Sequence, residues 1–246
     1  MVNMEVCANS VRSALAAQKG GAIRVELCDN LLEGGTTPSY AQIKVAKELL
    51  SIQVYPIIRP RGGDFLYDDL EFSLMKADIT LCRSLKCDGV VFGILKADGS
   101  VDMERCAELI ELAKPMKATF HRAFDMSHHL EIALENIIEL GFERILTSGG
   151  VASALKGASV ISKLIEQAAG RIVIMPGAGI SITNIAELIK STGAKEFHAS
   201  AKIPVPGKMN FRNPDLNMGA VTDEFNYDLT DEHTVRNLIE LANSAE

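Results

Sequence analysis

The sequence lacks the features of a membrane, secreted or nucleic-acid-binding protein. No apolar run approaches the roughly 20 residues of a membrane span, and residues 1–8 do not join a basic stretch to a long apolar one as a secretory signal does. The 25 Lys and Arg residues are outnumbered by 32 Asp and Glu, which leaves a net charge of −7 and no general basic surface for nucleic acid or anionic lipid. We therefore expect a cytoplasmic protein whose partner is a small molecule or an ion, with no nucleic acid and no membrane involved.

Several chemical signatures are also missing. The 5 cysteines are an odd number and form no CxxC pair, so neither a disulfide scaffold nor a zinc ribbon fits, and reduced thiols are expected. No GxGxxG loop follows the first apolar run, which argues against a dinucleotide-binding fold and leaves no organic cofactor indicated. No Lys stands within the end of a predicted strand and no His-x-His opens the first one. A Schiff-base aldolase and a metal-dependent hydrolase of that type are therefore disfavoured.

What is present is a repeated alternation of two patterns. Short runs rich in Val, Ile and Leu alternate with segments of helical period eight times along the 246 residues. This alternation is typical of parallel βα units, and the length is close to the roughly 250 residues of a TIM (β/α)8 barrel. We therefore predict a single α/β domain over residues 1–246, a TIM barrel. The predicted strands are Met4–Ala8, Ile23–Cys28, Gln53–Arg59, Gly89–Phe92, Lys117–His121, Arg144–Thr147, Ile172–Pro176 and Glu196–Ala199.

The sequence marks some of the intervening segments more clearly than others. Leu130–Leu140 is the clearest helix, because its apolar residues recur at three- and four-residue steps and a glycine ends the run. Another helix is expected over Ile182–Ile189, and the last over Asp231–Ala242 with Thr230 as a possible cap. Residues 201–229 are rich in Pro and Gly and too long for an ordinary connection. We expect this stretch to overhang the mouth of the barrel as a lid.

Alternate residues of the first two predicted strands bring charged and thiol groups to one side. Every second side chain of a barrel strand faces inward, and those at the carboxyl end reach the mouth, where ligands bind. The apolar residues suit the outer helix layer, which leaves as the inward set Glu5 and Cys7 in the first strand, and Arg24, Glu26 and Cys28 in the second. The carboxylates and arginines are expected to pair with one another or with a ligand.

Further polar residues follow the other strands. The same alternation turns Arg59, His121 and His198 inward, and the loops add Arg61, Arg122, Asp125, Ser148 and Gly149. The segment 176–181, which contains Gly177 and Gly179, stands directly before a predicted helix, where glycine N–H groups can form an anion site. Each group also has a structural interpretation. The charges can form a buried ion network, the cysteines can be small apolar core residues, and the glycine turn can be a tight connection without a ligand.

Taken together, six segments resemble one known family. They are Glu5–Ala8, Val25–Cys28, Glu33–Ser39, Ile58–Phe65, Thr119–Asp125 and Leu146–Gly150. The sequence closely resembles the CutC family of copper homeostasis proteins, and the match runs on through Phe197–Ser200 and weakly into Phe211–Asn213. The resemblance implies a cytoplasmic TIM barrel that forms a homo-oligomer and handles copper, with Cu(I) as the ligand. The family's proposed cysteine ligands correspond to Cys7 and Cys28, and thiolates are ligands that Cu(I) prefers.

The residues leave two functions open. In the first, the chain is a copper-binding protein in which Cys7 and Cys28 hold Cu(I). In the second, it is an enzyme acting on a small anionic metabolite, a carboxylate or a phosphate ester, because acidic, basic and imidazole groups converge on the mouth. In that enzyme the anion would be held by Arg61, Arg122, Ser148, Gly149, Gly177 and Gly179, and the catalytic residues would be Glu26, Arg59, His121 and Asp125.

Overall fold

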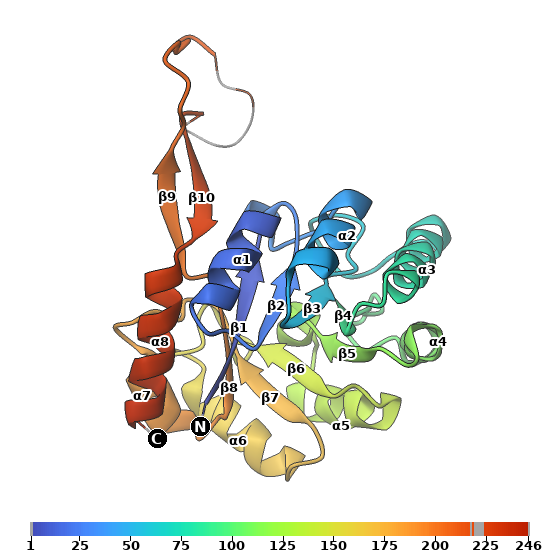
Figure 1. The fold of residues 1–246 in the computed structure, drawn as a ribbon. Helices are drawn as coiled ribbons and strands as arrows, with labels where there is room; N and C mark the ends of the chain where they lie inside the picture. Colours follow the sequence, from blue (N-terminus) through green and yellow to red (C-terminus); the bar gives the residue numbers. More distant parts are fainter. Residues whose placement is uncertain (1, 217, 219–223, 246) are drawn as a thin grey trace.

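Strands and helices alternate along the chain, with the strands inside and the helices around them (Figure 1). The structure is a computed structural model and describes residues 2–216, 218 and 224–245. The barrel strands are β1 (Asn3–Ala8), β2 (Arg24–Leu27), β3 (Gln53–Pro56), β4 (Gly89–Phe92), β5 (Lys117–Phe120), β6 (Arg144–Thr147), β7 (Val173–Pro176) and β8 (Glu196–Ala199). The helices are α1 (Val11–Lys19), α2 (Tyr40–Leu49), α3 (Asp69–Ser84), α4 (Met103–Ala113), α5 (Leu130–Leu140), α6 (Ala158–Ala168), α7 (Ile185–Thr192) and α8 (Glu232–Ala245).

The strands close into a barrel. Two parallel four-stranded sheets, ordered β3-β2-β1-β8 and β4-β5-β6-β7, are joined by a parallel bridge between Ile57 and Val91, and β7 lies beside β8. This arrangement confirms the predicted α/β TIM barrel. Across β1 and β2 Cys7 lies opposite Glu26, and across β1 and β8 Glu5 lies opposite His198. The register therefore brings polar residues of three neighbouring strands next to one another.

Buried apolar residues form two separate groups. The large one fills the space between strands and helices and includes Met4, Val6, Val25 and Leu27. The small one consists of Cys7, Cys28, Tyr55, Ile57 and Val91. Because neighbouring residues of β1 and β2 fall into different groups, the apolar faces of these strands meet the helices, as predicted, and the polar and thiol-bearing faces line the interior.

Several element boundaries differ from prediction because local hydrogen bonds compete with the regular structure. β3 ends at Pro56 rather than at Arg59, whose backbone N–H donates to Thr37 Oγ1 at 3.0 Å and turns toward the loop after β2. α7 begins at Ile185 rather than Ile182. The intervening residues form a turn in which the Ser181 N–H donates to Asn184 Oδ1 at 2.9 Å. The glycine turn after β7 therefore does not stand directly before a helix.

The expected cap of the last helix was also wrong by one residue. Thr230 is the last residue of a strand, and the backbone N–H of Thr234 donates to Asp231 Oδ2 at 2.8 Å. A carboxylate at this position satisfies an N–H group that the first turn of a helix leaves without a partner.

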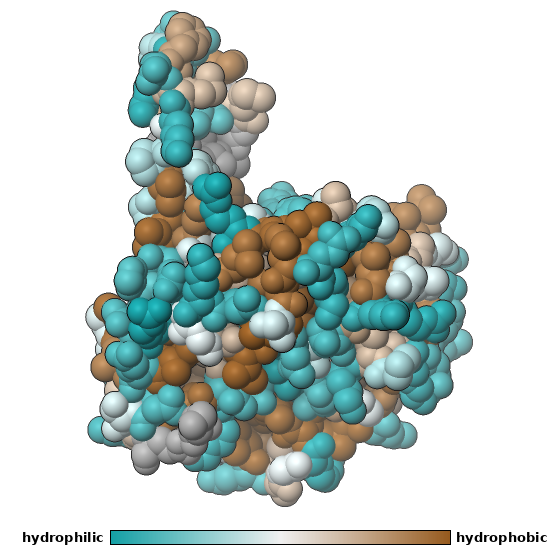
Figure 2. Space-filling view, in the orientation of Figure 1, coloured by the Kyte–Doolittle hydropathy of each residue, from teal (hydrophilic) through white to brown (hydrophobic). Residues whose placement is uncertain are grey.

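The stretch 201–229 contains a β-hairpin. Its strands are β9 (Lys202–Pro206) and β10 (Asn226–Thr230), which pair antiparallel, while residues 217 and 219–223 lie outside the described part of the chain. The hairpin extends away from the barrel (Figures 1 and 2). Met209, Phe211 and Leu216 are exposed along it. None of the described helices is long and apolar enough to cross a membrane.

Candidate functional site: a cavity at the carboxyl ends of the strands

A cavity of about 440 Å³ opens at the carboxyl ends of the strands. Seven of the predicted site residues line it, namely Cys7, Glu26, Arg59, His121, Arg122, Asp125 and Gly179. They come from five different strands and the loops that follow, so the fold gathers residues that are far apart in the sequence. His198, which the strand pattern turned inward but which was not assigned a role, lines the cavity as well.

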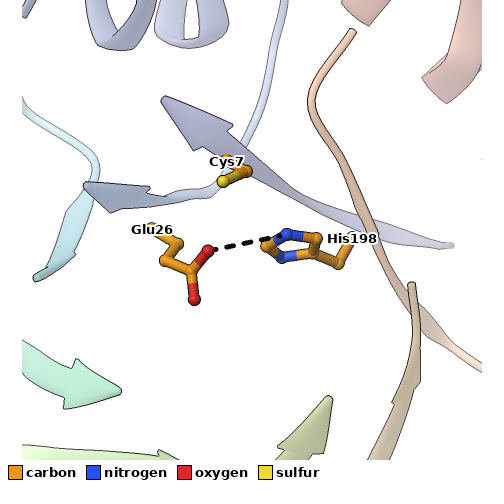
Figure 3. Close-up of side chains that lie close together, drawn as sticks. All are labelled: Cys7, Glu26 and His198. Atoms are coloured by element: carbon orange, nitrogen blue, oxygen red, sulfur yellow. Dashed lines mark ion pairs between the residues drawn. The ribbon is translucent and has the colours of Figure 1, made fainter. Parts of the chain in front are cut away.

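Cys7, Glu26 and His198 form a buried group that could hold a metal ion. One potential ligand atom from each residue lies within 4.8 Å of the other two. Figure 3 shows the side chains of Cys7, from β1, and Glu26, from β2, directed toward His198, from β8. The distance from His198 Nε2 to Glu26 Oε2 is 3.7 Å. A thiol, an imidazole and a carboxylate are all ligand types that metal sites use.

His198 is oriented by a second carboxylate behind it. Its Nδ1 lies 2.7 Å from Glu5 Oε1, and Glu5 is fully buried. Burial lowers the pKa of His198, but hydrogen bonds with Cys7 and Glu5 and the charge of Glu26 outweigh this and raise it well above its ordinary value. In the metal-free protein the imidazole is therefore a cation between two carboxylates.

The second predicted cysteine lies behind the first. The Sγ atoms of Cys7 and Cys28 are 3.4 Å apart, and the Cys28 thiol donates to the backbone oxygen of Ala8 at 3.6 Å. Cys28 is completely buried and is absent from the cavity lining, whereas Cys7 reaches the cavity. The hydrogen bond with Cys28 and burial raise the pKa of Cys7 well above its ordinary value, so Cys7 is a protonated thiol when no metal is bound.

Beneath this group a network of ion pairs fills the amino end of the barrel. Arg24 pairs with Glu5 and, at 2.8 Å, with Glu196, and Arg144 pairs with the same Glu196 oxygen at 2.8 Å. Tyr55 lies under both guanidinium groups and donates its hydroxyl to Glu143 at 2.7 Å. Burial raises the pKa of Glu5, but the charge of Arg24 and the hydrogen bond from His198 lower it well below its ordinary value. The expected pairing of carboxylates with arginines thus occurs here, at the floor of the site.

The predicted anion site after β6 is filled by a carboxylate of the protein itself. Asp125 accepts the backbone N–H groups of Ser148 and Gly150 at 3.0 Å, together with the Ser148 hydroxyl at 2.9 Å. The Gly149 N–H donates to Thr147 Oγ1 at 2.9 Å. Arg122 donates to Asp125 at 2.8 Å as well. Ser148 and Gly149, which were predicted to bind an anion, are absent from the cavity lining, and the N–H groups of this turn already have a carboxylate or a hydroxyl as their partner.

Two other predicted anion-binding residues also lie outside the cavity lining. Arg61 is engaged by Glu71 at 2.5 Å and Asp64 at 3.0 Å, both outside the cavity lining. Gly177 donates its backbone N–H to Thr147 at 2.9 Å, and a Cβ at this position would meet Leu146. Gly177 therefore allows close packing against Leu146 that a side chain would prevent. Gly179, two residues later, is the part of this turn that lines the cavity.

Arg59 and His121, which follow β3 and β5, line another part of the cavity wall. The Arg59 guanidinium donates to the backbone oxygens of Glu33, Gly35 and Gly63 at 2.6, 2.8 and 2.9 Å, so it ties two loops together. His121 accepts the N–H of Ala123 on Nδ1 at 3.2 Å. Burial and the charge of Arg59 lower the pKa of His121 to about 3, which keeps the imidazole neutral.

A family model described as the CutC family matches residues 2–203. The chain belongs to the CutC family. The mouse protein named copper homeostasis protein cutC homolog is 51% identical over 241 residues, which are 97% of this chain and 89% of the mouse protein. The crystal structure of the CutC protein from Streptococcus agalactiae is 37% identical, with a TM-score of 0.78 over 81% of this chain and 99% of that one.

A more distant structure supports the fold alone. Phosphoribosylanthranilate isomerase from Thermotoga maritima is 12% identical, with a TM-score of 0.59 over 99% of this chain and 100% of that one. The CutC chain is thus a TIM barrel of the CutC copper homeostasis protein family. The resemblance to the family indicated Cys7 and Cys28 as ligands, and Cys7 belongs to the buried group with Glu26 and His198. The strand pattern turned His198 inward but gave it no role. The signal that could have found it is the register of β8, which sets His198 beside β1.

Proposed function

We propose that this CutC chain binds Cu(I) through Cys7 and Cys28, with His198 as a third ligand. The observation that carries the proposal is the pair of thiol sulfurs 3.4 Å apart, of which Cys7 reaches the cavity and Cys28 lies behind it. Soft sulfur ligands select Cu(I) over the harder divalent ions, and two of them suffice for the low coordination numbers of this ion. The ion would enter from the cavity, meet Cys7 first and replace the thiol protons of both cysteines.

His198 suits the role of third ligand because its two ring nitrogens have different surroundings. Glu5 accepts from Nδ1, 2.7 Å away, which would fix the tautomer and leave Nε2 free for a metal on the side of Cys7 and Glu26. This carboxylate–histidine–metal arrangement is common in metal sites and raises the basicity of the ligand nitrogen. Cu(I) would replace the proton on Nε2, so its positive charge is retained beside the carboxylate of Glu26.

Two further observations support copper binding in a reducing compartment, the cytoplasm. All five cysteines are free thiols, and the two proposed ligands are close together without being joined. The mouse relative carries the name of a copper homeostasis protein. Reduced thiols and Cu(I) belong to the same redox conditions.

The experiment is anaerobic competition between the protein and a chromogenic Cu(I) chelator. We expect one Cu(I) per chain, and a loss of affinity of about 100-fold or more in the Cys7→Ala, Cys28→Ala double variant. Cys106→Ala is the matched control, because Cys106 is a buried cysteine of α4 outside the cavity lining.

Three results would overturn the proposal. The first is an unchanged Cu(I) affinity in the double variant, and the second is an equal loss in Cys106→Ala. The third is a preference for Zn²⁺ over Cu(I) in the same competition assay, since a Cys, His and carboxylate set can also hold zinc.

A further inference from the structure

One polar atom in the wall of the cavity has no partner. His121 is 3% exposed and its ring lies in the cavity lining, yet its Nε2 forms no hydrogen bond within the described part of the chain. Because Nδ1 accepts a backbone N–H, the neutral ring carries its proton on Nε2. A buried N–H donor without an acceptor is costly, so His121 lacks one hydrogen-bond acceptor.

The same wall holds a buried cation without an anion. Arg59 is 4% exposed, and its guanidinium donates to backbone oxygens but forms no ion pair with a carboxylate among the described residues. The Phe65 ring lies close to both residues, with the Arg59 guanidinium 5.0 Å and the His121 ring centre 4.9 Å from its centre. A buried positive charge favours a negative charge nearby.

The remainder of the cavity is largely apolar. Its lining includes Leu31, Ile57, Phe65, Met126, Leu146 and Ile180. A volume of about 440 Å³ lies in the range of small-molecule sites, where apolar walls surround a few polar groups that orient the ligand. The occupant that fits would be small, with an apolar body and one anionic acceptor.

We propose that this cavity binds a small monocarboxylate with an apolar body. Its carboxylate accepts the Nε2–H of His121 and compensates the charge of Arg59, while its body packs on Phe65 and the neighbouring apolar residues. This site uses residues other than the proposed copper ligands, which lie on β1, directly after β2 and on β8. The carboxylate therefore binds to the metal-free protein too.

A carboxylate fits better than a phosphate for two reasons. The backbone N–H groups after β6, which would suit a phosphate, are already bound to Asp125. Glu26 also lines the cavity, and a second negative charge on the ligand would be repelled by it. His121 Nε2 and Arg59 Nε are both buried donors without a partner among the described residues, and Arg59 supplies one uncompensated positive charge. Two donors and one positive charge match the two oxygens and single negative charge of a carboxylate.

The experiment is a titration of metal-free protein, kept in a metal chelator, with three probes. Butyrate has the proposed chemistry, butyramide has its shape without the charge, and inorganic phosphate tests the other anion class. The readout is the ¹⁵N signal of His121 Nε2 in long-range ¹H–¹⁵N spectra, together with thermal unfolding. We expect saturable shifts with butyrate, at least about tenfold weaker binding of butyramide, and no shift with phosphate.

The variant His121→Asn retains an acceptor for Ala123 but removes Nε2, and should weaken butyrate binding by about tenfold or more. His233→Asn, an exposed histidine of α8, is the control and should bind butyrate like the parent. If His121→Asn does not fold, the spectra of the unmodified chain decide alone.

The proposal is overturned if butyrate gives no saturable shift at His121, if butyramide binds equally well, or if phosphate binds instead. Because copper is absent throughout, none of these results bears on Cu(I) binding. Conversely, a failed copper competition leaves the carboxylate site untouched.

Discussion

Both ends of the barrel interior contain buried polar residues, but these residues have different partners at the two ends. At the amino end, Glu5, Arg24, Arg144 and Glu196 form a closed network in which every charge meets an opposite one. At the carboxyl end, Cys7, Glu26 and His198 lie against a cavity. Buried charges that pair within the molecule hold a structure together, whereas groups that open onto a cavity are available to a ligand. Buried polar side chains are thus paired with one another at one end and open to a ligand at the other.

Glu5 connects the two ends. One of its oxygens meets Arg24 in the closed network, and the other meets His198 at 2.7 Å. The closed end therefore fixes the orientation of a proposed ligand at the open end. A substitution of Glu5 should therefore change both the stability and the metal affinity. A substitution of another residue at either end should change only one of the two.

The largest effect is expected on stability, from Arg24→Met. Removing this guanidinium leaves the fully buried Glu5 without its main counter-charge, and breaking one side of such a pair costs about 3–5 kcal/mol. Cys7→Ala, at the open end, should cost only about 1 kcal/mol, because it deletes one sulfur. Urea unfolding at pH 7 measures both. Equal losses would contradict the division into a structural and a functional end. Arg236→Met is the control, because it removes an exposed ion pair of α8 and should change the stability little.

The next effect is on copper affinity, from Glu5→Gln. The amide keeps an acceptor for His198 but loses the charge that makes the ring a better ligand, so Cu(I) affinity should fall about 10- to 100-fold in the chelator competition. Glu196→Gln is the matched control, since Glu196 also pairs with Arg24 but, unlike Glu5, forms no hydrogen bond or ion pair with His198 in the described part of the chain. If both variants lose affinity equally, the effect comes from the closed network and not from His198.

The sequence was sufficient to predict which residues of β1 and β2 face the barrel interior. The alternation in β1 and β2 identified Glu5, Cys7, Arg24, Glu26 and Cys28 as inward residues, because the period of two in a strand needs no tertiary information. It could not tell which inward residues pair. Whether Glu5 meets Arg24 or a ligand depends on the stagger between strands, which the sequence does not state.

The loop predictions failed for a different reason. The turn after β6 has the residues of an anion site, and Asp125 is the anion that occupies it. Arg61 and Gly177 have the right chemistry but face other partners. Loop conformation decides which groups remain free, and side chains far away in the sequence determine it, so composition alone overestimated the number of free donors.

A smaller effect separates the two buried histidines by pH. The folded-state pKa of His121 is about 3, below its ordinary 6.5, so the unfolded chain binds more protons between these values. The contribution of His121 to stability is present above pH 6.5 and is lost as pH falls toward 3. His198, whose pKa is raised, contributes in the opposite sense. Between pH 7.5 and 5.5 the parent should lose about 1.4 kcal/mol more than His121→Asn in urea unfolding. An equal pH dependence in the parent and His121→Asn would mean that His121 is protonated in the folded state. His233→Asn is the control and should show the pH dependence of the parent.

The smallest effect tests whether the closed end can be weakened without disturbing the open one. Tyr55→Phe removes a hydroxyl that donates to Glu143 at 2.7 Å, while the ring remains under Arg24 and Arg144. Loss of one partly buried hydrogen bond should lower the free energy of unfolding by about 1 kcal/mol. Cu(I) affinity and butyrate binding should both stay at the parent values, because Tyr55 meets neither His198 nor His121 through its hydroxyl. A change in either would mean that the network at the amino end transmits its arrangement to the cavity by routes other than Glu5.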